Sequence, residues 1–298
     1  MEIFEFENKS YLISFLLLTR KNPEGIKKVI NNFTSLSDKQ LDNFELIIKI
    51  DYDDEESINL IKEFSNQNTN LKFLVSSRLK GYPSMNEFSR DIAYLARGKY
   101  LMHISDDTEM VTPNWNRILE NELKETRFYA CNFNFVSSKG ESVNIKDAEE
   151  PKWAEDRTFL GKVGVNFHDF IYIAYPKKIM ELWGFVAPHA LVDNFIGDIG
   201  KRVSFHPWNT PVYEFIDSIE INHYGGFPED SESFHTSELS EKVHNTYRSY
   251  INDALFFDCA NKVKEYIEWE KWHKQHKLNI VNDFRNSGLS VKDYFDLK

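Results

Sequence analysis

The chain has 298 residues, of which 41% are hydrophobic and 15% aromatic, and its formal net charge is −11. This length allows one large α/β domain or a domain with a smaller appendage, and the acidic charge argues against a nucleic-acid partner. Only two cysteines, Cys131 and Cys259, are present, which excludes a disulfide framework and a thiolate metal cluster. The apolar run at residues 11–18 is too short to span a bilayer and follows acidic residues, so we expect no transmembrane segment and a cytoplasmic protein.

The first 110 residues alternate between predicted strands and helices. Dense apolar runs predict three strands, at residues 11–19, 44–50 and 71–75. Asn22 is placed to cap the first helix, with Pro23 at its first position, and Ser84 with Glu87 matches a capping box for the third. Strands that alternate with helices predict a mostly parallel sheet covered on both faces.

Two predicted strands end in carboxylates. The apolar strand at residues 100–104 is followed by Asp106 and Asp107, and the second strand is followed by Asp51 and Asp53. Ligands of parallel sheets bind at the carboxyl ends of the strands, so these acids are expected to face one cleft. Carboxylates suit Mg²⁺ or Mn²⁺, which can neutralise a diphosphate. The alternative is a solvated turn, because Asp is common after strands.

After residue 112 the alternation is less regular. The patterns predict, in chain order, a helix opening at Thr112, a strand at 128–136, a polar loop at 137–157, an apolar run at 163–175, helices from Pro176 and at 191–199, and short strands at 203–205 and 216–223. A loop rich in Gly, Pro, Ser and acidic residues follows at 224–238, and helical spacing resumes from about residue 241. The tail is therefore expected to be a helical appendage.

The order of these elements resembles the GT-A fold glycosyltransferases, most closely the large family-2 type that uses nucleotide-diphosphate sugars. The matching positions are residues 13–19, 50–54, 86–100 and 104–107, and later Pro176, 183–185, 192–193 and 222–223. The resemblance implies an α/β, GT-A-like (Rossmann-like) fold with a mostly parallel central sheet flanked by helices. It also implies a nucleotide-sugar-binding and catalytic domain at residues 1–235 and a helical extension at 236–298.

The resemblance assigns a metal site to the acid pair. Asp107 matches the last acid of the family's short metal motif, and Asp106 matches the neighbouring acid that faces the ribose and the metal. Ser105 stands where many relatives have another Asp. His223 matches a late histidine that completes the metal shell in some of these enzymes, and a core histidine is the alternative. The implied metal is Mn²⁺ or Mg²⁺, and an imidazole ligand suits Mn²⁺ at least as well.

The resemblance also assigns nucleotide-binding and catalytic residues. Asp51 or Asp53 matches the acid that accepts a hydrogen bond from the nucleotide base. Arg78 and Lys80 lie in the loop where relatives hold a basic residue against the nucleotide, and solvated surface charges are the alternative. Asp193 matches the catalytic base, which takes the proton of the acceptor hydroxyl as the new bond forms. A first-turn helix acid favoured by the helix dipole is the alternative for Asp193.

These residues imply a metal-dependent, inverting glycosyltransferase of the hexosyltransferase class. Its donor would be a UDP- or GDP-sugar and its acceptor a glycan, lipid, protein or small molecule, with the loop at 224–238 closing over the donor. The helical tail is expected to form a homo-oligomer. One alternative is a sugar-phosphate nucleotidyltransferase, which the single glycine at residues 19–25 makes weaker. Another is a GT-A-like protein that binds nucleotide or glycan without catalysis.

Overall fold

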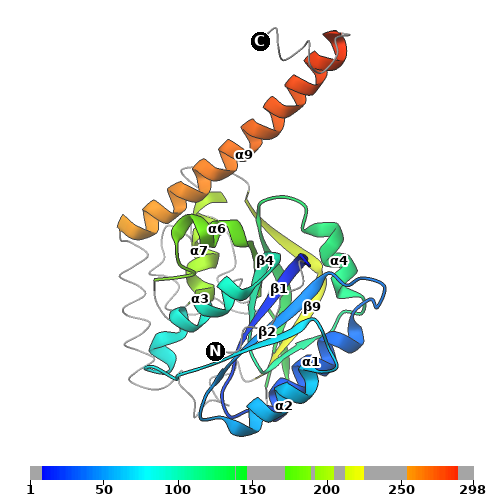
Figure 1. Ribbon diagram of the computed structural model, residues 1–298, viewed down its shortest axis with the longest axis vertical. Helices are drawn as coiled ribbons and strands as arrows, with labels where there is room; N and C mark the ends of the chain where they lie inside the picture. Colours follow the sequence, from blue (N-terminus) through cyan, green and yellow to red (C-terminus); the bar gives the residue numbers. More distant parts are fainter. Residues whose placement is uncertain are drawn as a thin grey trace.

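The computed structural model describes residues 9–137, 139–145, 172–188, 192–204, 212–224 and 254–287 (Figure 1). The first half contains β1 (Tyr11–Leu18), α1 (Pro23–Leu36), β2 (Phe44–Asp51), α2 (Glu55–Ser65), β3 (Leu71–Ser76), the 3-10 helix η1 (Tyr82–Ser84), α3 (Met85–Leu95) and β4 (Gly98–Ile104). The second half contains β5 (Thr108–Met110), α4 (Trp115–Glu122), β6 (Phe128–Val136), β7 (Ser142–Asn144), β8 (Ile173–Pro176), α6 (Lys177–Trp183), α7 (Val192–Ser204), β9 (Tyr213–Tyr224) and α9 (Ala254–Ser287).

The described strands form one curled sheet in the order β3-β2-β1-β4-β8-β6-β9-β5, with β7 paired to β6. The four strands of the first half are mutually parallel, whereas β8 runs antiparallel to both β4 and β6. Leu17 of β1 pairs with Ile48 of β2 and with Ile104 of β4, so these strands end at the same edge. The predicted α/β fold with a central sheet flanked by helices is confirmed. The sheet is parallel from β3 to β4, as predicted, whereas its second half is mixed, because β8, β5 and β7 pair antiparallel with their neighbours.

Each face of the sheet packs against its own set of helices. Phe15 of β1 points to the face covered by α1 and α4, where its ring lies 5.0 Å from Phe33 and 5.2 Å from Trp115. The neighbouring residue Leu16 points to the opposite face and joins the core formed with α3, α6 and α7. This alternation along a buried strand explains why β1 has no polar face in its sequence. The strand ends that carry the acids are thus held between two cores.

The helix α9 has one packed part and one projecting part. Phe256, Val263 and Ile267 are buried in the core shared with α6 and α7. Beyond them the helix runs away from the sheet, and Trp269 and Trp272 are 54% and 58% exposed (Figure 1). The predicted helical appendage is therefore present, while the predicted boundary at residues 235 and 236 lies outside the described residues.

No helix in the described part of the chain has both the length and the apolar composition needed to cross a membrane.

Three local predictions differ from the structure. The expected strand at 203–205 is wrong for the residues described, because Val203 and Ser204 end α7, whose apolar spacing continues to Val203. Ser84 does occupy the N-cap position of α3, but its side chain makes no capping bond and instead accepts from the Lys80 backbone N–H at 3.3 Å. The short strands β5 and β7 lie in stretches where no strand was predicted.

Candidate functional site

Two adjacent residues after β1 connect the acidic strand ends. The Thr19 hydroxyl donates to Oδ2 of Asp106 at 2.5 Å, at the end of β4. Arg20 donates to Asp51 at 2.8 Å and to Asp53 at 3.1 Å, at the end of β2. The acids predicted at separate strand ends are therefore brought to one edge of the sheet, through contacts with the residues that follow the strand between them.

The Asp106 backbone also lies against the start of α1. The Asn22 side chain accepts from the Gly25 N–H at 3.0 Å and caps the helix, as the sequence predicts. A Cβ atom on Gly25 would lie 2.7 Å from the Asp106 carbonyl oxygen, so only glycine allows this close approach. Burial raises the pKa of Asp106, and the charge of Asp107 adds to the rise, while hydrogen bonds from Thr19 and Asn22 oppose it.

Asp107 and His223 meet because β5 pairs with β9. Thr108 lies opposite His223 in this ladder, and the Asp107 carbonyl oxygen accepts from the Tyr224 N–H at 3.1 Å. Nδ1 of His223 consequently lies 3.6 Å from Oδ1 of Asp107. The side chain of Asp107 is 37% exposed and that of His223 is 16% exposed. The two residues expected to share a metal ion are thus side by side.

A group of hydroxyls lies behind this pair. The Ser105 hydroxyl donates to Oδ1 of Asp107, and Oγ1 of Thr108 lies 3.1 Å from Oγ of Ser105. The Tyr172 hydroxyl lies 2.9 Å from Oγ1 of Thr108 and 2.8 Å from Nδ1 of His223. Ser105, at the position where the resemblance would have another acid, therefore donates a hydrogen bond to Asp107. Tyr172 was not predicted as a site residue, since nothing in its apolar and aromatic run distinguishes it from a core tyrosine.

Asp193 lies in the first turn of α7 and is half-buried. Its charge acts on Tyr172: burial is the main cause that raises the pKa of this phenol, and the nearby charges of Asp107 and Asp193 raise it further. Asp193 is therefore within electrostatic range of the same buried hydroxyl that contacts His223. Asp193, which is the predicted catalytic base, and Asp107 therefore both lie close enough to Tyr172 for their charges to act on it.

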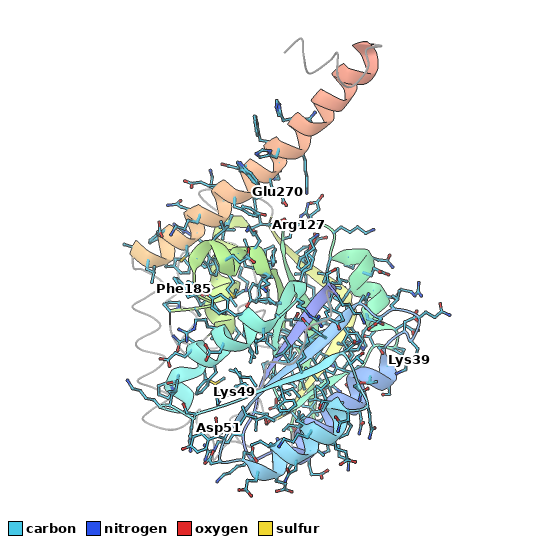
Figure 2. The ribbon with its side chains drawn as sticks, viewed as in Figure 1. Lys39, Lys49, Asp51, Arg127, Phe185 and Glu270 are labelled. Atoms are coloured by element: carbon cyan, nitrogen blue, oxygen red, sulfur yellow. The ribbon has the colours of Figure 1, made fainter. Side chains whose placement is uncertain are left out.

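Asp51 is held more tightly than the sequence suggests. It is 3% exposed, and its second carboxylate oxygen is bound by the buried ammonium of Lys49. Figure 2 shows Lys49 and Asp51 close together, at the end of the sheet remote from Glu270. Asp53 is more open, with a side chain that is 44% exposed. A ligand at this strand end meets Arg20 and Asp53 before it reaches Asp51.

Arg78 and Lys80 lie in the loop after β3, and both are exposed. The register places Ser76, the last residue of β3, opposite Asp51, so the loop begins beside the acidic end of β2. Neither basic side chain forms an ion pair with a described residue, whereas the Arg78 carbonyl accepts from the Gly81 N–H at 2.8 Å in a turn. The two cations are available to an anionic ligand at this edge.

The donor set at the acid pair is small for a metal ion. Within the described residues, no group of three His, Cys, Asp or Glu side chains is arranged to hold one. Asp107 supplies a carboxylate, which suits both Mg²⁺ and Mn²⁺. His223 supplies an imidazole, which is a softer ligand and suits Mn²⁺ at least as well as Mg²⁺. Oxygen atoms from a ligand such as a diphosphate would have to complete the shell, and the exposure of Asp107 leaves room for them.

A cavity of about 850 Å³ adjoins the acids. Its wall is formed by one face of α1, including Lys27 and Asn31, and by Asp106, Asp107 and Tyr224. This volume is in the range of cavities that hold a ligand of moderate size. The acid pair therefore lies on the wall of a cavity large enough for a substrate.

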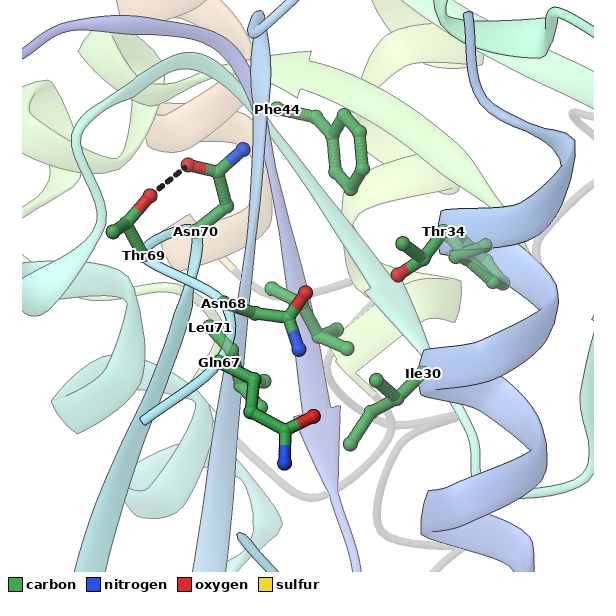
Figure 3. A pocket seen from close by; sticks show the side chains of 10 residues that line it. Ile30, Thr34, Phe44, Gln67, Asn68, Thr69, Asn70 and Leu71 are labelled. Carbon is green, nitrogen blue, oxygen red and sulfur yellow. Dashed lines mark hydrogen bonds between the residues drawn. The ribbon is translucent and has the colours of Figure 1, made fainter. Parts of the chain in front are cut away.

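A second, smaller pocket of about 220 Å³ lies at the opposite edge of the sheet. Figure 3 shows Ile30 and Thr34 of α1 facing Phe44 and the loop that leads into β3. Phe44 and Leu71 begin β2 and β3, so the pocket is at the amino ends of the strands, and none of its lining residues is one of the acids discussed above. Ligands of parallel sheets bind at the carboxyl ends of the strands, so this pocket lies at the edge of the sheet that is opposite to the expected site.

The fold is similar to solved structures, although no model of a protein family and no curated protein sequence matches the chain. The structure of S. aureus TarS 1-349 with UDP-GlcNAc matches at 10% identity over 85% of this chain and 70% of the solved one, with a TM-score of 0.54. The complex with UDP matches at 11% identity over 81% and 72%, with a TM-score of 0.51. In the structure of TarS 1-349 without a named ligand the match spans 73% of this chain but only 61% of the solved chain, at 12% identity and a TM-score of 0.49. The chain thus shares the GT-A-like fold of the two TarS complexes, whose TM-scores exceed 0.5.

Proposed function

We propose that the protein is a glycosyltransferase that moves a sugar from a nucleotide-diphosphate sugar to an acceptor hydroxyl. One observation carries the proposal: Asp106, Asp107 and His223 adjoin the carboxyl edge of a sheet whose fold is shared with TarS structures bound to UDP and UDP-GlcNAc. Fold alone does not determine chemistry, and the convergence of these side chains is what links this fold to a reaction.

The nucleotide is proposed to bind where β1, β2 and β3 end. Arg20 and Asp53 offer a cation and an acceptor at the open side of the buried Asp51. Arg78 and Lys80 add positive charge that favours a diphosphate. Asp106 is proposed to face the ribose. Because the similar structures hold UDP and UDP-GlcNAc, UDP-sugars are the first donors to test, ahead of GDP-sugars.

A divalent cation is proposed next to Asp107, with His223 and Asp106 as its further protein neighbours. When bound, the ion would neutralise the diphosphate and stabilise the charge of the departing nucleotide. Few described side chains could ligate the ion, so oxygen atoms of the bound nucleotide sugar would have to complete its coordination shell. The imidazole of His223 makes Mn²⁺ at least as suitable as Mg²⁺. The hydrogen bond that Ser105 donates to Oδ1 of Asp107 would help to orient this carboxylate toward the ion.

Asp193 is proposed to take the proton of the acceptor hydroxyl. A sugar hydroxyl is a poor nucleophile at neutral pH, and a carboxylate within reach lowers the barrier to attack. Attack from the face opposite the departing diphosphate inverts the anomeric configuration, as in the family-2 type of hexosyltransferase that the sequence resembles. The acceptor is proposed to be a hydroxyl-bearing glycan, lipid, protein or small molecule.

Cys131 and Cys259 are both buried and free, which fits a chain kept in a reducing compartment, and we propose that it acts in the cytoplasm. The projecting part of α9 is proposed to contact a second copy of the chain. A binding protein without turnover is the second candidate function. The observation that favours it is the lack of a three-residue metal cluster among the described residues, together with Ser105 in place of an acid.

The experiment is a turnover assay with a panel of UDP- and GDP-sugars, with and without Mn²⁺, that follows release of the nucleoside diphosphate. The wild type is expected to release UDP from a UDP-sugar, whereas Asp107→Asn and Asp193→Asn lose at least about 100-fold of kcat. Asp91→Asn, on the exposed surface of α3, is the control and keeps full turnover. Tight binding of a nucleotide sugar with no turnover on any acceptor would favour the second candidate.

A further inference from the structure

Tyr172 is held in an unusual backbone conformation beside the proposed site. Its φ angle is 50°, in the left-handed region that bulky side chains rarely adopt. The residue is 1% exposed, and its ring packs edge-on against Phe133 at 5.4 Å. Such conformations persist where the surroundings hold them, and they gather at functional sites. In this conformation the phenol hydroxyl lies 2.8 Å from Nδ1 of His223.

The hydrogen bonds around this hydroxyl form a chain that ends on a carboxylate. Asp107 can only accept, so Ser105 gives its proton to Asp107. Thr108 must then be the donor in its 3.1 Å contact with Ser105, because the single proton of Ser105 is already used. Tyr172 can in turn donate to Thr108 at 2.9 Å. The hydroxyl of Tyr172 then has a lone pair, and no proton, to offer His223.

The position of Asp107 favours the same arrangement. Nδ1 of His223 lies 3.6 Å from Oδ1 of Asp107, and an N–H edge is attracted to a carboxylate whereas a nitrogen lone pair is repelled. Nε2 of His223 makes no hydrogen bond to a described residue. The two nitrogens of the ring are therefore in different environments.

We propose that Tyr172 is a positioning residue that keeps the proton of the neutral His223 imidazole on Nδ1 and leaves the Nε2 lone pair for a ligand. The Thr108 hydroxyl donates a hydrogen bond to Ser105, and the Ser105 hydroxyl donates one to Asp107. Tyr172 is thereby left to donate to Thr108 and to accept from Nδ1 of His223. The identity of the tautomer follows from these contacts alone, whereas its use, in binding a divalent cation beside Asp107, rests on the proposed function. Outer partners of a ligating imidazole fix its orientation and tautomer in this way.

A second tyrosine–histidine pair serves as a matched control. The Tyr175 hydroxyl lies 3.1 Å from Nε2 of His103, with the rings stacked at 6.1 Å between centroids. His103 of β4 is half-buried, and desolvation is the one cause that lowers its pKa. Removing the Tyr175 hydroxyl therefore deletes an equivalent phenol–imidazole bond without touching the hydroxyl chain that ends on Asp107.

The test is the tautomeric state of His223 measured by ¹⁵N NMR on histidine-labelled full-length protein, without metal or nucleotide, with the signal assigned by His223→Gln. The wild type is expected to show a protonated Nδ1 and an unprotonated Nε2. Thr108→Val removes the acceptor of the Tyr172 proton, so Tyr172 turns this proton to Nδ1 and the histidine proton moves to Nε2. Tyr172→Phe leaves a mixture of both tautomers, and Tyr175→Phe leaves the His223 signal unchanged.

A protonated Nε2 in the wild type would overturn the inference, and so would a tautomer that neither Tyr172→Phe nor Thr108→Val alters. Thr108→Val keeps the phenol and the backbone of Tyr172, so the test survives if Tyr172→Phe folds poorly. The NMR experiment reports the tautomer of His223 whether or not the protein turns over a nucleotide sugar. Failure of the proposed function is thereby distinguished from failure of the tautomer assignment.

The second readout is Mn²⁺ binding, followed by electron paramagnetic resonance in the presence of UDP. Loss of an outer partner typically weakens metal binding roughly 10- to 100-fold, and this loss is expected for Tyr172→Phe and Thr108→Val. Tyr175→Phe is expected to bind Mn²⁺ as the wild type does. If the tautomer changes as expected and Mn²⁺ affinity does not, His223 is positioned for another ligand and the cation part of the inference is rejected.

Discussion

The guanidinium of Arg20 lies 2.8 Å from the carboxylate of Asp51, which is 3% exposed. This contact joins the loop after β1 to the end of β2. Lys49 binds the other oxygen of Asp51 from inside the sheet, with its ammonium 3.8 Å from the centre of the Phe88 ring. A buried acid with two cationic partners fixes the strand end on which the proposed nucleotide site is built, since a buried charge is stable only when it is paired.

Arg20→Ala is expected to lower the free energy of unfolding by about 1–3 kcal/mol, because it leaves Asp51 with one charged partner. It is also expected to weaken binding of a UDP-sugar. Urea unfolding and a titration of the same samples measure both effects. Arg90→Ala is the control: its ion pair with Asp91 is on the surface, and its removal is expected to change stability by less than about 1 kcal/mol. Equal effects of the two substitutions would contradict the role given to Arg20.

Asp106→Asn is expected to stabilise the fold at neutral pH while it impairs ligand binding. Burial raises the pKa of Asp106, so the folded state binds a proton more readily than the unfolded state does. The contribution of Asp106 to the free energy of unfolding is therefore largest below its pKa in the unfolded state. This contribution is lost as the pH rises through its pKa in the folded state. Asn stays neutral, so the Tm of the variant should exceed that of the wild type at pH 7. The difference should shrink toward pH 4, and a lower Tm at pH 7 would show that Asp106 is held favourably as an anion.

His103 is expected to destabilise the protein in mild acid. Burial lowers its pKa to about 4 from an ordinary value of 6.5, so the folded state resists protonation. The stability it contributes is present above pH 6.5 and is lost as the pH falls to 4, by about 3 kcal/mol in all. Thermal unfolding of wild type and His103→Phe from pH 7 to pH 4 should give a flatter profile for the variant. A pH profile for the variant as steep as that of the wild type would contradict this role of His103.

The exposed tryptophans of α9 are expected to hold two copies of the chain together. Trp269 packs against His273 with the ring planes tilted by 59°, and Trp272 stacks on His276, which forms an aromatic stripe on the projecting part of the helix. A helix of this kind gains most of its stability from packing. Analytical ultracentrifugation should show a dimer that the double variant Trp269→Ser and Trp272→Ser converts to a monomer. Lys271→Ser is the control, and a monomeric wild type would exclude the contact.

The sequence pattern was sufficient to predict which strands end in acids. Apolar runs and cap residues such as Asn22 define β1 to β4, and parallel strands must end at one edge, so the approach of Asp51 and Asp106 follows from local patterns. The position of His223 depends on the resemblance, because its pairing with Thr108 joins strands far apart in the chain. Long-range register of this kind has no local signal.

Other features of the site could not be predicted because they depend on packing. Arg20 lies in a loop and looks like any surface cation until β2 is placed beside it. Tyr172 belongs to an apolar and aromatic run, which gives no sign of its left-handed backbone or of the contact between its hydroxyl and His223. Ser105 looks like the loss of a metal ligand, yet it donates to Asp107. In each case the partner is contributed by another part of the chain.

The central claim is that Asp107 stands where a nucleotide-diphosphate sugar binds. Calorimetric titration of UDP-GlcNAc in the presence of Mn²⁺ tests it most directly, with wild type, Asp107→Asn and the surface control Asp91→Asn measured side by side. Binding by the wild type and the control, with at least about tenfold weaker binding by Asp107→Asn, is the expected result. Equal affinity of all three proteins, or no binding of any UDP- or GDP-sugar by the wild type, would contradict the claim.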